Sequence, residues 1–297
     1  MEYSNPELPE DINTSKTSPL KEFFILTVGL VAIVFITIYL LIVVIDNFAD
    51  KIPFELEQDL PISGFIEKQN SIKLPSYLVQ VSRKVIKSFK LPAPMSITVH
   101  YVNDDTVNAF ATLGGHIVLY RGLLEKLTHE DELAMVIAHE VAHIKYRHPI
   151  LSMSHGVVVG LVLSVISSSV GDSVASDIMG TTGMASLLRF SREYEYQSDK
   201  EAINSLIKIY GHAEGALGLF KVFESEFGKD QSFEFLATHP LTNNRITQTK
   251  EMIERHNITG YKTMTNFPVS FKLWLDKQKE SFKVSERELE TKHSKTE

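Results

Sequence analysis

One uninterrupted apolar run stands out near the N-terminus of this 297-residue chain. Residues 23–45 contain no charged side chain, and a helix of that length extends about 34 Å at about 1.5 Å per residue. The hydrocarbon core of a bilayer is about 30 Å thick, so we predict a transmembrane helix over residues 23–45. A buried helix of a soluble protein is the alternative, but such a helix is rarely apolar on every side over this length.

The segments that flank this run are polar. Residues 1–22 combine polar side chains with three prolines, which predicts a disordered tail. The apolar run is longer than the core of a cleaved signal peptide, about 7–15 residues, so we expect an uncleaved anchor in the lipid bilayer. Lys16 and Lys21 precede the run and Lys51 follows it. This charge bias favours a cytoplasmic N-terminus and a large domain outside the cytoplasm.

The rest of the chain divides into three parts by pattern. Residues 46–74 contain two prolines and predict a linker. Apolar positions then recur with helical and strand periods over residues 75–275, which predicts a globular domain. Residues 276–297 are dense in charge and predict a solvated helix or a tail.

Local periodicity within this domain predicts its first elements. An amphipathic pattern over residues 75–90 predicts a helix. Residues 95–102, 108–113 and 116–120 predict strands, the last two joined at Gly114-Gly115, which is a hairpin signal. The remaining apolar positions mostly follow a helical period.

Composition limits the classes of function. The chain has no cysteine, which excludes disulfides, thiolate metal sites, iron–sulfur clusters and a cysteine nucleophile. A formal net charge of -7 argues against nucleic acid as a partner, because phosphate binding requires a basic face.

The strongest chemical signal is H-E-x-x-H at residues 139–143. Four residues of helix turn through about 400°, so His139 and His143 lie one turn apart on one face and can hold one zinc ion. Glu140 lies beside that face, where it can reach a zinc-bound water as general base. Random order would produce about 0.03 copies of this motif, so we prefer a zinc site to a chance match.

A hydrolytic zinc site needs a third protein ligand. His148 lies off the ligand face, and we prefer Glu195 to His148 and His155 because Glu195 and Asp199 share a helical face. Glu195 could bind the metal while Asp199 accepts a hydrogen bond from a ligand histidine. Glu193 points elsewhere on such a helix.

Four ordered segments match a known family: N-A-F-A at 108–111 with G-G-H-I at 114–117 and G-L-L at 122–124; H-E-x-x-H at 139–143; S-R-x-x-E-x-x-x-D at 191–199; and H-P at 239–240 with R-I at 245–246. With these segments the chain resembles the membrane-associated zinc metallopeptidases of the gluzincin type, which include HtpX-type and CAAX prenyl proteases. Ser198 departs from the family, which usually has Ala before the Asp.

The resemblance implies a mostly α fold with a small β-sheet, a zincin-like α+β metallopeptidase with one zinc ion per chain. It also implies a metalloendopeptidase that hydrolyses polypeptides with a zinc-activated water, in quality control of envelope or membrane proteins. We expect a single-pass protein of a bacterial inner membrane with the catalytic domain in the periplasm. The alternatives are a catalytically silent binding or chaperone-like module, and a di-iron oxygenase, which would need a second E-x-x-H in the core to partner Glu140 and His143.

Three further segments leave alternatives open. His239 precedes Pro240, which favours a loop, so His239 is a candidate gate or oxyanion donor, or only part of a turn. The segment Gly114, Gly115, His116 and Ile117 could pair with an extended substrate at a sheet edge, or belong to an internal hairpin. For residues 156–190 we prefer a helical hairpin that flanks the active site to two membrane spans.

Overall fold

The structure is a computed structural model that describes residues 18–48, 51–58, 71–154, 156, 190–226, 235–256 and 263–293. Residues 1–17 of the tail predicted over 1–22, and nearly all of the hairpin predicted over 156–190, lie outside the described residues. The predicted class is confirmed: most described residues are helical, and they surround one small sheet.

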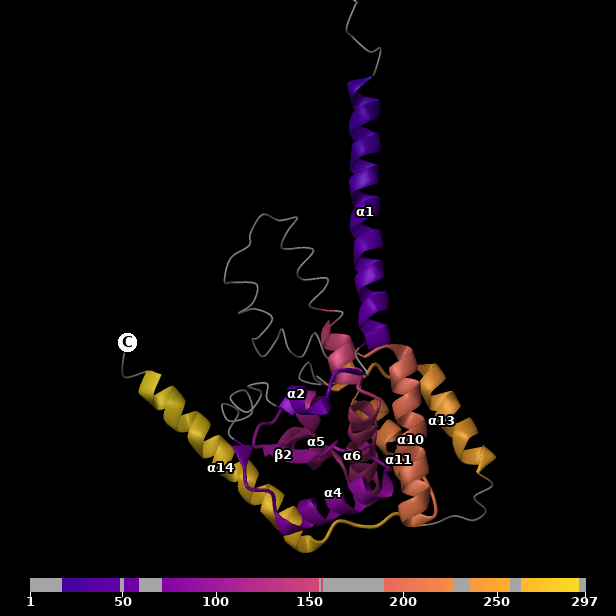
Figure 1. The fold of residues 1–297 in the computed structure, drawn as a ribbon. Coiled ribbons are helices and arrows are strands. Elements are labelled where there is room, and N and C mark those ends of the chain that lie inside the picture. The colour runs from indigo at the N-terminus through magenta and orange to yellow at the C-terminus, as the bar shows by residue number, and fades with distance from the viewer. Residues whose placement is uncertain are drawn as a thin grey trace, which may run out of the picture.

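The apolar run forms a single long helix, α1 (Pro19–Phe48), which projects away from the rest of the described chain (Figure 1). This helix is long and apolar enough to cross a membrane. None of its residues is buried, as expected for a helix whose surroundings are lipid. Helical structure begins at Pro19, before the predicted span and within the tail predicted over residues 1–22.

The described part of the segment predicted as a linker, residues 46–74, contains secondary structure. It contributes a short helix, α2 (Phe54–Gln58), and a two-residue strand, β1 (Ser71–Ile72). Within α2, the buried carboxylate of Glu57 forms an ion pair with Arg147 and accepts a hydrogen bond from the Gly114 N–H at 3.3 Å. This segment therefore packs into the domain.

The sheet has the order β1-β2-β4-β3, built from β2 (Thr98–Val102), β3 (Ala109–Thr112) and β4 (His116–Tyr120) besides β1. β3 and β4 pair antiparallel, which confirms the predicted hairpin, and β2 pairs parallel with β4. Because residues 116–119 of β4 are paired on both sides, His116 and Ile117 cannot receive a substrate strand at an edge. The predicted pairing of residues 114–117 with a substrate strand is therefore wrong, and these residues belong to an internal hairpin.

The turn between β3 and β4 requires glycine. A short 3-10 helix, η2 (Leu113–Gly115), connects the two strands, and Gly114 and Gly115 have φ angles of 71° and 80°. A Cβ on Gly115 would lie 2.0 Å from the backbone oxygen of Ser96. The dipeptide thus permits both a left-handed backbone and a close approach to a neighbouring segment.

The centre of the domain is α6 (Glu130–Lys145), which is buried from Asp131 to Ile144. It packs against α4 (Ser76–Ser88), α10 (Arg192–Tyr210), α11 (Glu214–Glu226) and β3. Further helices are α5 (Arg121–Lys126), α12 (Phe235–Thr238), α13 (Asn243–Arg255) and α14 (Val269–His293), and residues 148–154 are helical as well.

Alternation along β4 sends side chains to two apolar clusters. Ile117 and Leu119 join the main core with α6, while Val118 and Tyr120 join a smaller cluster on the opposite face of the sheet. Ile45, near the end of α1, packs against this smaller cluster. The membrane-type helix is therefore packed onto the domain at its C-terminal end.

Helix caps fix where α10 begins and ends. The Ser191 hydroxyl accepts a hydrogen bond from the Tyr194 N–H at the start of α10. Gly211 ends the helix with φ 74° and donates its N–H to the Ile207 carbonyl. These caps set the register of α10, and with it the face that the helix presents to α6.

Candidate metal centre

α6 presents two histidines one helical turn apart, as the spacing predicts. The Nε2 atoms of His139 and His143 lie 3.0 Å from each other, and both side chains are buried. Two imidazole nitrogens that face each other inside a protein need a proton or a cation between them.

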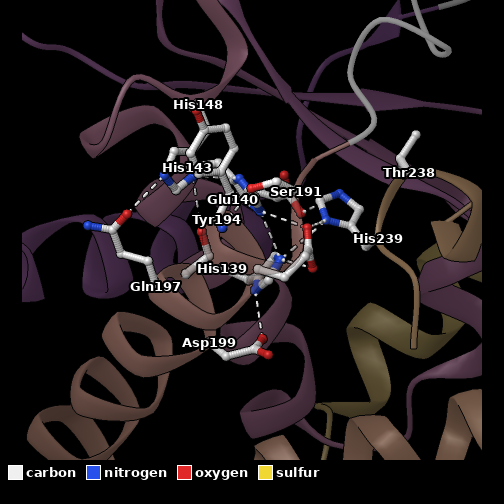
Figure 2. A network of polar contacts seen from close by, with 12 residues as sticks. His139, Glu140, His143, His148, Ser191, Tyr194, Gln197, Asp199, Thr238 and His239 are labelled. Atoms are coloured by element: carbon white, nitrogen blue, oxygen red, sulfur yellow. Dashed lines mark hydrogen bonds and ion pairs between the residues drawn. The ribbon is translucent and has the colours of Figure 1, made fainter. Parts of the chain in front are cut away.

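α10 brings the two predicted carboxylates to the same place. The Oε2 atom of Glu195 lies 3.4 Å from His139 Nε2, and its Oε1 atom lies 3.5 Å from His143 Nε2. One turn later, Asp199 Oδ1 lies 3.0 Å from Nδ1 of His139 (Figure 2). Asp199 thus contacts the ring nitrogen of His139 that faces away from Glu195.

A third histidine enters from a different segment. α12 ends at Thr238, and His239 follows in the loop before Pro240, as proline predicts. The Nδ1 atom of His239 lies 2.9 Å from Glu195 Oε1 and 3.3 Å from His139 Nε2. One nitrogen or oxygen from each of His139, His143, Glu195 and His239 lies within 4.8 Å of the others.

These separations fit a small cation. Four ligands arranged tetrahedrally at about 2.0–2.1 Å from a zinc ion lie about 3.3–3.4 Å from one another. The distances given above between the candidate ligand atoms of these four residues run from 2.9 to 3.5 Å. The chemistry also fits, because zinc takes imidazole nitrogen and carboxylate oxygen.

Arg245 of α13 links the carboxylates of this site. Its guanidinium binds both oxygens of Asp199 at 2.8 Å and lies 2.7 Å from Oε2 of Glu195. The same side chain donates hydrogen bonds to the carbonyls of His239 and Pro240. One buried cation therefore holds α10 and the His239 loop together.

The buried charges shift each other's pKa values. Burial opposes the charged form of His139, but Glu195 and Asp199 outweigh it and raise its pKa to about 10. Burial alone would raise the pKa of Glu195 and of Asp199, yet Arg245 and nearby histidines hold both below their usual values. Both carboxylates are therefore ionised at neutral pH.

The four candidate metal ligands, His139, His143, Glu195 and His239, are called the donor set below. Glu140 lies next to the donor set but is not a member of it. Both carboxylate oxygens are buried and lack a hydrogen-bond partner among the described residues. Oε1 lies 3.5 Å from Nε2 of His239, and burial raises the pKa of Glu140. A buried carboxylate with a raised pKa beside a candidate metal centre is the arrangement that a general base requires.

His148 contacts Nδ1 of His143 and is not a member of the donor set. The ring of Phe190 stacks on His143 with centroids 3.9 Å apart. Sequence reasoning considered His148 only as a metal ligand and gave no role to Phe190. Their neighbourhood depends on how α10 packs on α6, which no local pattern encodes.

Comparison with known proteins identifies the family. The model of peptidase family M48 matches residues 74–253, more than half of the chain. The chain belongs to peptidase family M48. This range contains all four residues of the donor set and Glu140. The metallopeptidase resemblance is thus confirmed, while HtpX-type or CAAX-type specificity stays a prediction.

Curated relatives carry protease names. A putative beta-barrel assembly-enhancing protease of Vibrio cholerae serotype O1 is 26% identical over 197 residues, 63% of this chain and 40% of the relative. The beta-barrel assembly-enhancing protease of Escherichia coli K12 is 27% identical over 161 residues, 50% of this chain and 33% of the relative. The mitochondrial metalloendopeptidase OMA1 of Schizosaccharomyces pombe is 29% identical over 188 residues, 61% of this chain and 55% of the relative. The chain therefore covers only about a third to a half of these relatives' lengths.

Proposed function

We propose that this protein is a membrane-anchored, zinc-dependent endopeptidase. The anchor is residues 23–45 and the catalytic domain is residues 75–275. The observation that carries the proposal is that three members of the donor set, His139, His143 and Glu195, lie buried beside Glu140. Membership of peptidase family M48 supports the reaction class.

Each residue has a distinct task in this proposal. His139, His143 and Glu195 hold the zinc ion. Asp199 orients the His139 ring by contacting Nδ1 of that ring. When bound, zinc acts as a Lewis acid that polarises the peptide carbonyl and makes water a better nucleophile. Glu140 takes the proton from the attacking water and passes it to the leaving amine.

Replacement of Glu140 by Gln tests the base. Gln keeps the shape of the side chain but cannot accept a proton, so Glu140→Gln should retain one zinc ion per chain and lose casein hydrolysis. General acid–base catalysis contributes about 10²–10⁴-fold, so we expect a loss of at least about 10². Hydrolysis at the wild-type rate by Glu140→Gln would remove Glu140 from this role.

The third ligand has a matched control on the same helix. Glu195→Ala should weaken zinc binding strongly because it removes a ligand atom, as measured by competition with a chelator. Glu193 lies two residues earlier and is exposed, so Glu193→Ala should leave zinc affinity unchanged. Full zinc retention in Glu195→Ala would move the third ligand elsewhere.

We further propose that His239 gates the site. A catalytic zinc keeps one position open, whereas a fourth protein ligand closes it. His239 is fully buried with Nδ1 among the donors, so it would occupy the open position until the loop moves. The other functional reading, an oxyanion donor, predicts the opposite change in rate.

His239→Ala separates these two roles. If His239 is a gate, peptide hydrolysis should be faster than wild type at equal zinc content. If it is an oxyanion donor, turnover should fall by about 10²–10³. His256→Ala, at an exposed histidine, is the control, and an unchanged rate in His239→Ala would leave only a structural turn.

The substrates that we propose are polypeptides in or near a membrane, in quality control of envelope or membrane proteins. The helix α1 supports a membrane location, and two relatives are named for beta-barrel assembly. Proteomics of proteins retained by Glu140→Gln would identify substrates. A zinc-free or zinc-loaded but inactive wild-type protein would instead support the silent binding module.

A further inference from the structure

The nitrogen of His143 that faces away from the donor set contacts a second histidine. His148 Nδ1 lies 3.0 Å from His143 Nδ1. His148 follows Arg147, whose φ of 63° turns the chain directly after α6. This turn brings the His148 ring back against the helix that it has just left. The side chain is buried.

The other end of His148 contacts α10. Its Nε2 atom lies 3.1 Å from Oε1 of Gln197, and Ser198 Oγ lies 3.5 Å from its Nδ1 atom. Figure 2 draws the contact of Gln197 with this imidazole as a dashed line. A continuous hydrogen-bonded chain thus runs from the metal site to an amide on the neighbouring helix.

Hydrogen-bond chemistry gives this chain a direction. The carbonyl oxygen of Gln197 can only accept, so Nε2 of His148 carries the proton, and Nδ1 of a neutral ring is then an acceptor. His143 must therefore donate its Nδ1–H to His148. Its Nε2 atom is left with a free lone pair directed at the donor set, which is the form that binds a metal.

We propose that His148 is a positioning residue for His143: the His143–His148–Gln197 chain selects the tautomer and fixes the ring orientation of this metal ligand. The inference rests on the proposed function in taking His143 as a ligand. The partner of His143 differs from that of His139, because the Nδ1–H of His139 donates to the Asp199 carboxylate. One ligand ring is thus held by an anion and the other by an uncharged imidazole.

Aromatic packing holds His148 in place. The Tyr194 ring stacks on His148 with centroids 4.1 Å apart and an interplanar angle of 10°. Phe190 stacks on His143 at 23°. Both rings of the pair are therefore fixed in orientation by a flat neighbour, so the hydrogen bond between them keeps its geometry.

Two substitutions separate the hydrogen bond from the packing. His148→Phe keeps a flat ring against Tyr194 but removes the acceptor. His148→Asn is smaller but places a carbonyl oxygen near the position of Nδ1 and keeps the acceptor. Both are made in full-length protein carrying Glu140→Gln, so that proteolysis does not interfere, with exposed His256→Phe as the control.

Zinc affinity is measured by chelator competition, and the tautomer of His143 by ¹⁵N NMR of the metal-free protein. His148→Phe should bind zinc about 10–100-fold more weakly, the usual cost of losing such a partner, and lose the Nδ1–H form of His143. His148→Asn should bind about tenfold more tightly than His148→Phe. His256→Phe should match its parent.

Two results would overturn the inference: wild-type zinc affinity together with the Nδ1–H tautomer in His148→Phe, or equal losses in the Phe and Asn variants, which would indicate packing alone. Absence of zinc binding in the Glu140→Gln parent would instead contradict the proposed function. The tautomer measurement on metal-free protein would still test the hydrogen-bonded chain.

Discussion

Arg245 is the residue on which the charges of the site depend most. It is buried and faces two ionised carboxylates, Glu195 and Asp199. Removing one partner of a buried charge network leaves the others uncompensated, which costs about 3–5 kcal/mol. A lysine would keep the charge but lose the two-pronged contact with Asp199.

We therefore expect Arg245→Met to lower the free energy of unfolding by about 3–5 kcal/mol, measured by urea unfolding in detergent. Arg245→Lys should fall between this variant and wild type. Arg255, near the end of α13, pairs with Glu251 at the surface, and Arg255→Met should change stability by less than about 1 kcal/mol. Equal stabilities of Arg245→Met and Arg255→Met would contradict this account.

Sequence spacing predicted which residues of one helix share a face, and it could not predict which helices meet. His139 and His143, like Glu195 and Asp199, are four apart on one helix, so helical geometry alone aligns each pair. The contact of His148 with His143 crosses a left-handed turn, and the contacts of Arg245 join α13 to α10. Such contacts arise only from tertiary packing.

The strands illustrate the same limit for elements. Alternation and the Gly114-Gly115 signal located β3 and β4 and their hairpin. They did not reveal that β2 pairs with β4 in parallel on the other side, because pairing between distant strands leaves no local mark. The predicted substrate edge failed for that reason.

The η2 turn should be sensitive to any added Cβ. Gly115→Ala combines a left-handed backbone with a Cβ 2.0 Å from Ser96 O, so we expect a loss of at least about 2 kcal/mol in unfolding free energy. Gly29→Ala in α1 is the control, since a Cβ there meets nothing within 4 Å. Urea unfolding of both variants checks this, and a stable Gly115→Ala protein would contradict it.

The side of the membrane on which the domain lies can be tested with reporter fusions. We expect the domain to lie outside the cytoplasm, from the lysine bias around α1. α14 continues to His293 and contributes Phe271 and Leu275 to the core, so a reporter belongs after Glu297. Alkaline phosphatase fused there should be active and green fluorescent protein dark; the reverse pattern would place the domain in the cytoplasm.

The position of His139 between two carboxylates has a consequence for how the site is loaded. With a pKa of about 10, the metal-free His139 carries a proton at neutral pH. The incoming cation must displace that proton, so metal uptake is an exchange reaction and the proton is a competitor. Higher pH favours loading up to the pKa, and acid favours release.

One displaced proton corresponds to about a tenfold gain in zinc affinity per pH unit. Chelator competition between about pH 6 and pH 8 should show that slope, after correction for the chelator. Calorimetry in buffers of different ionisation enthalpy should count about one proton released per zinc bound. An affinity that does not change between about pH 6 and pH 8 would mean that His139 is already neutral in the metal-free protein.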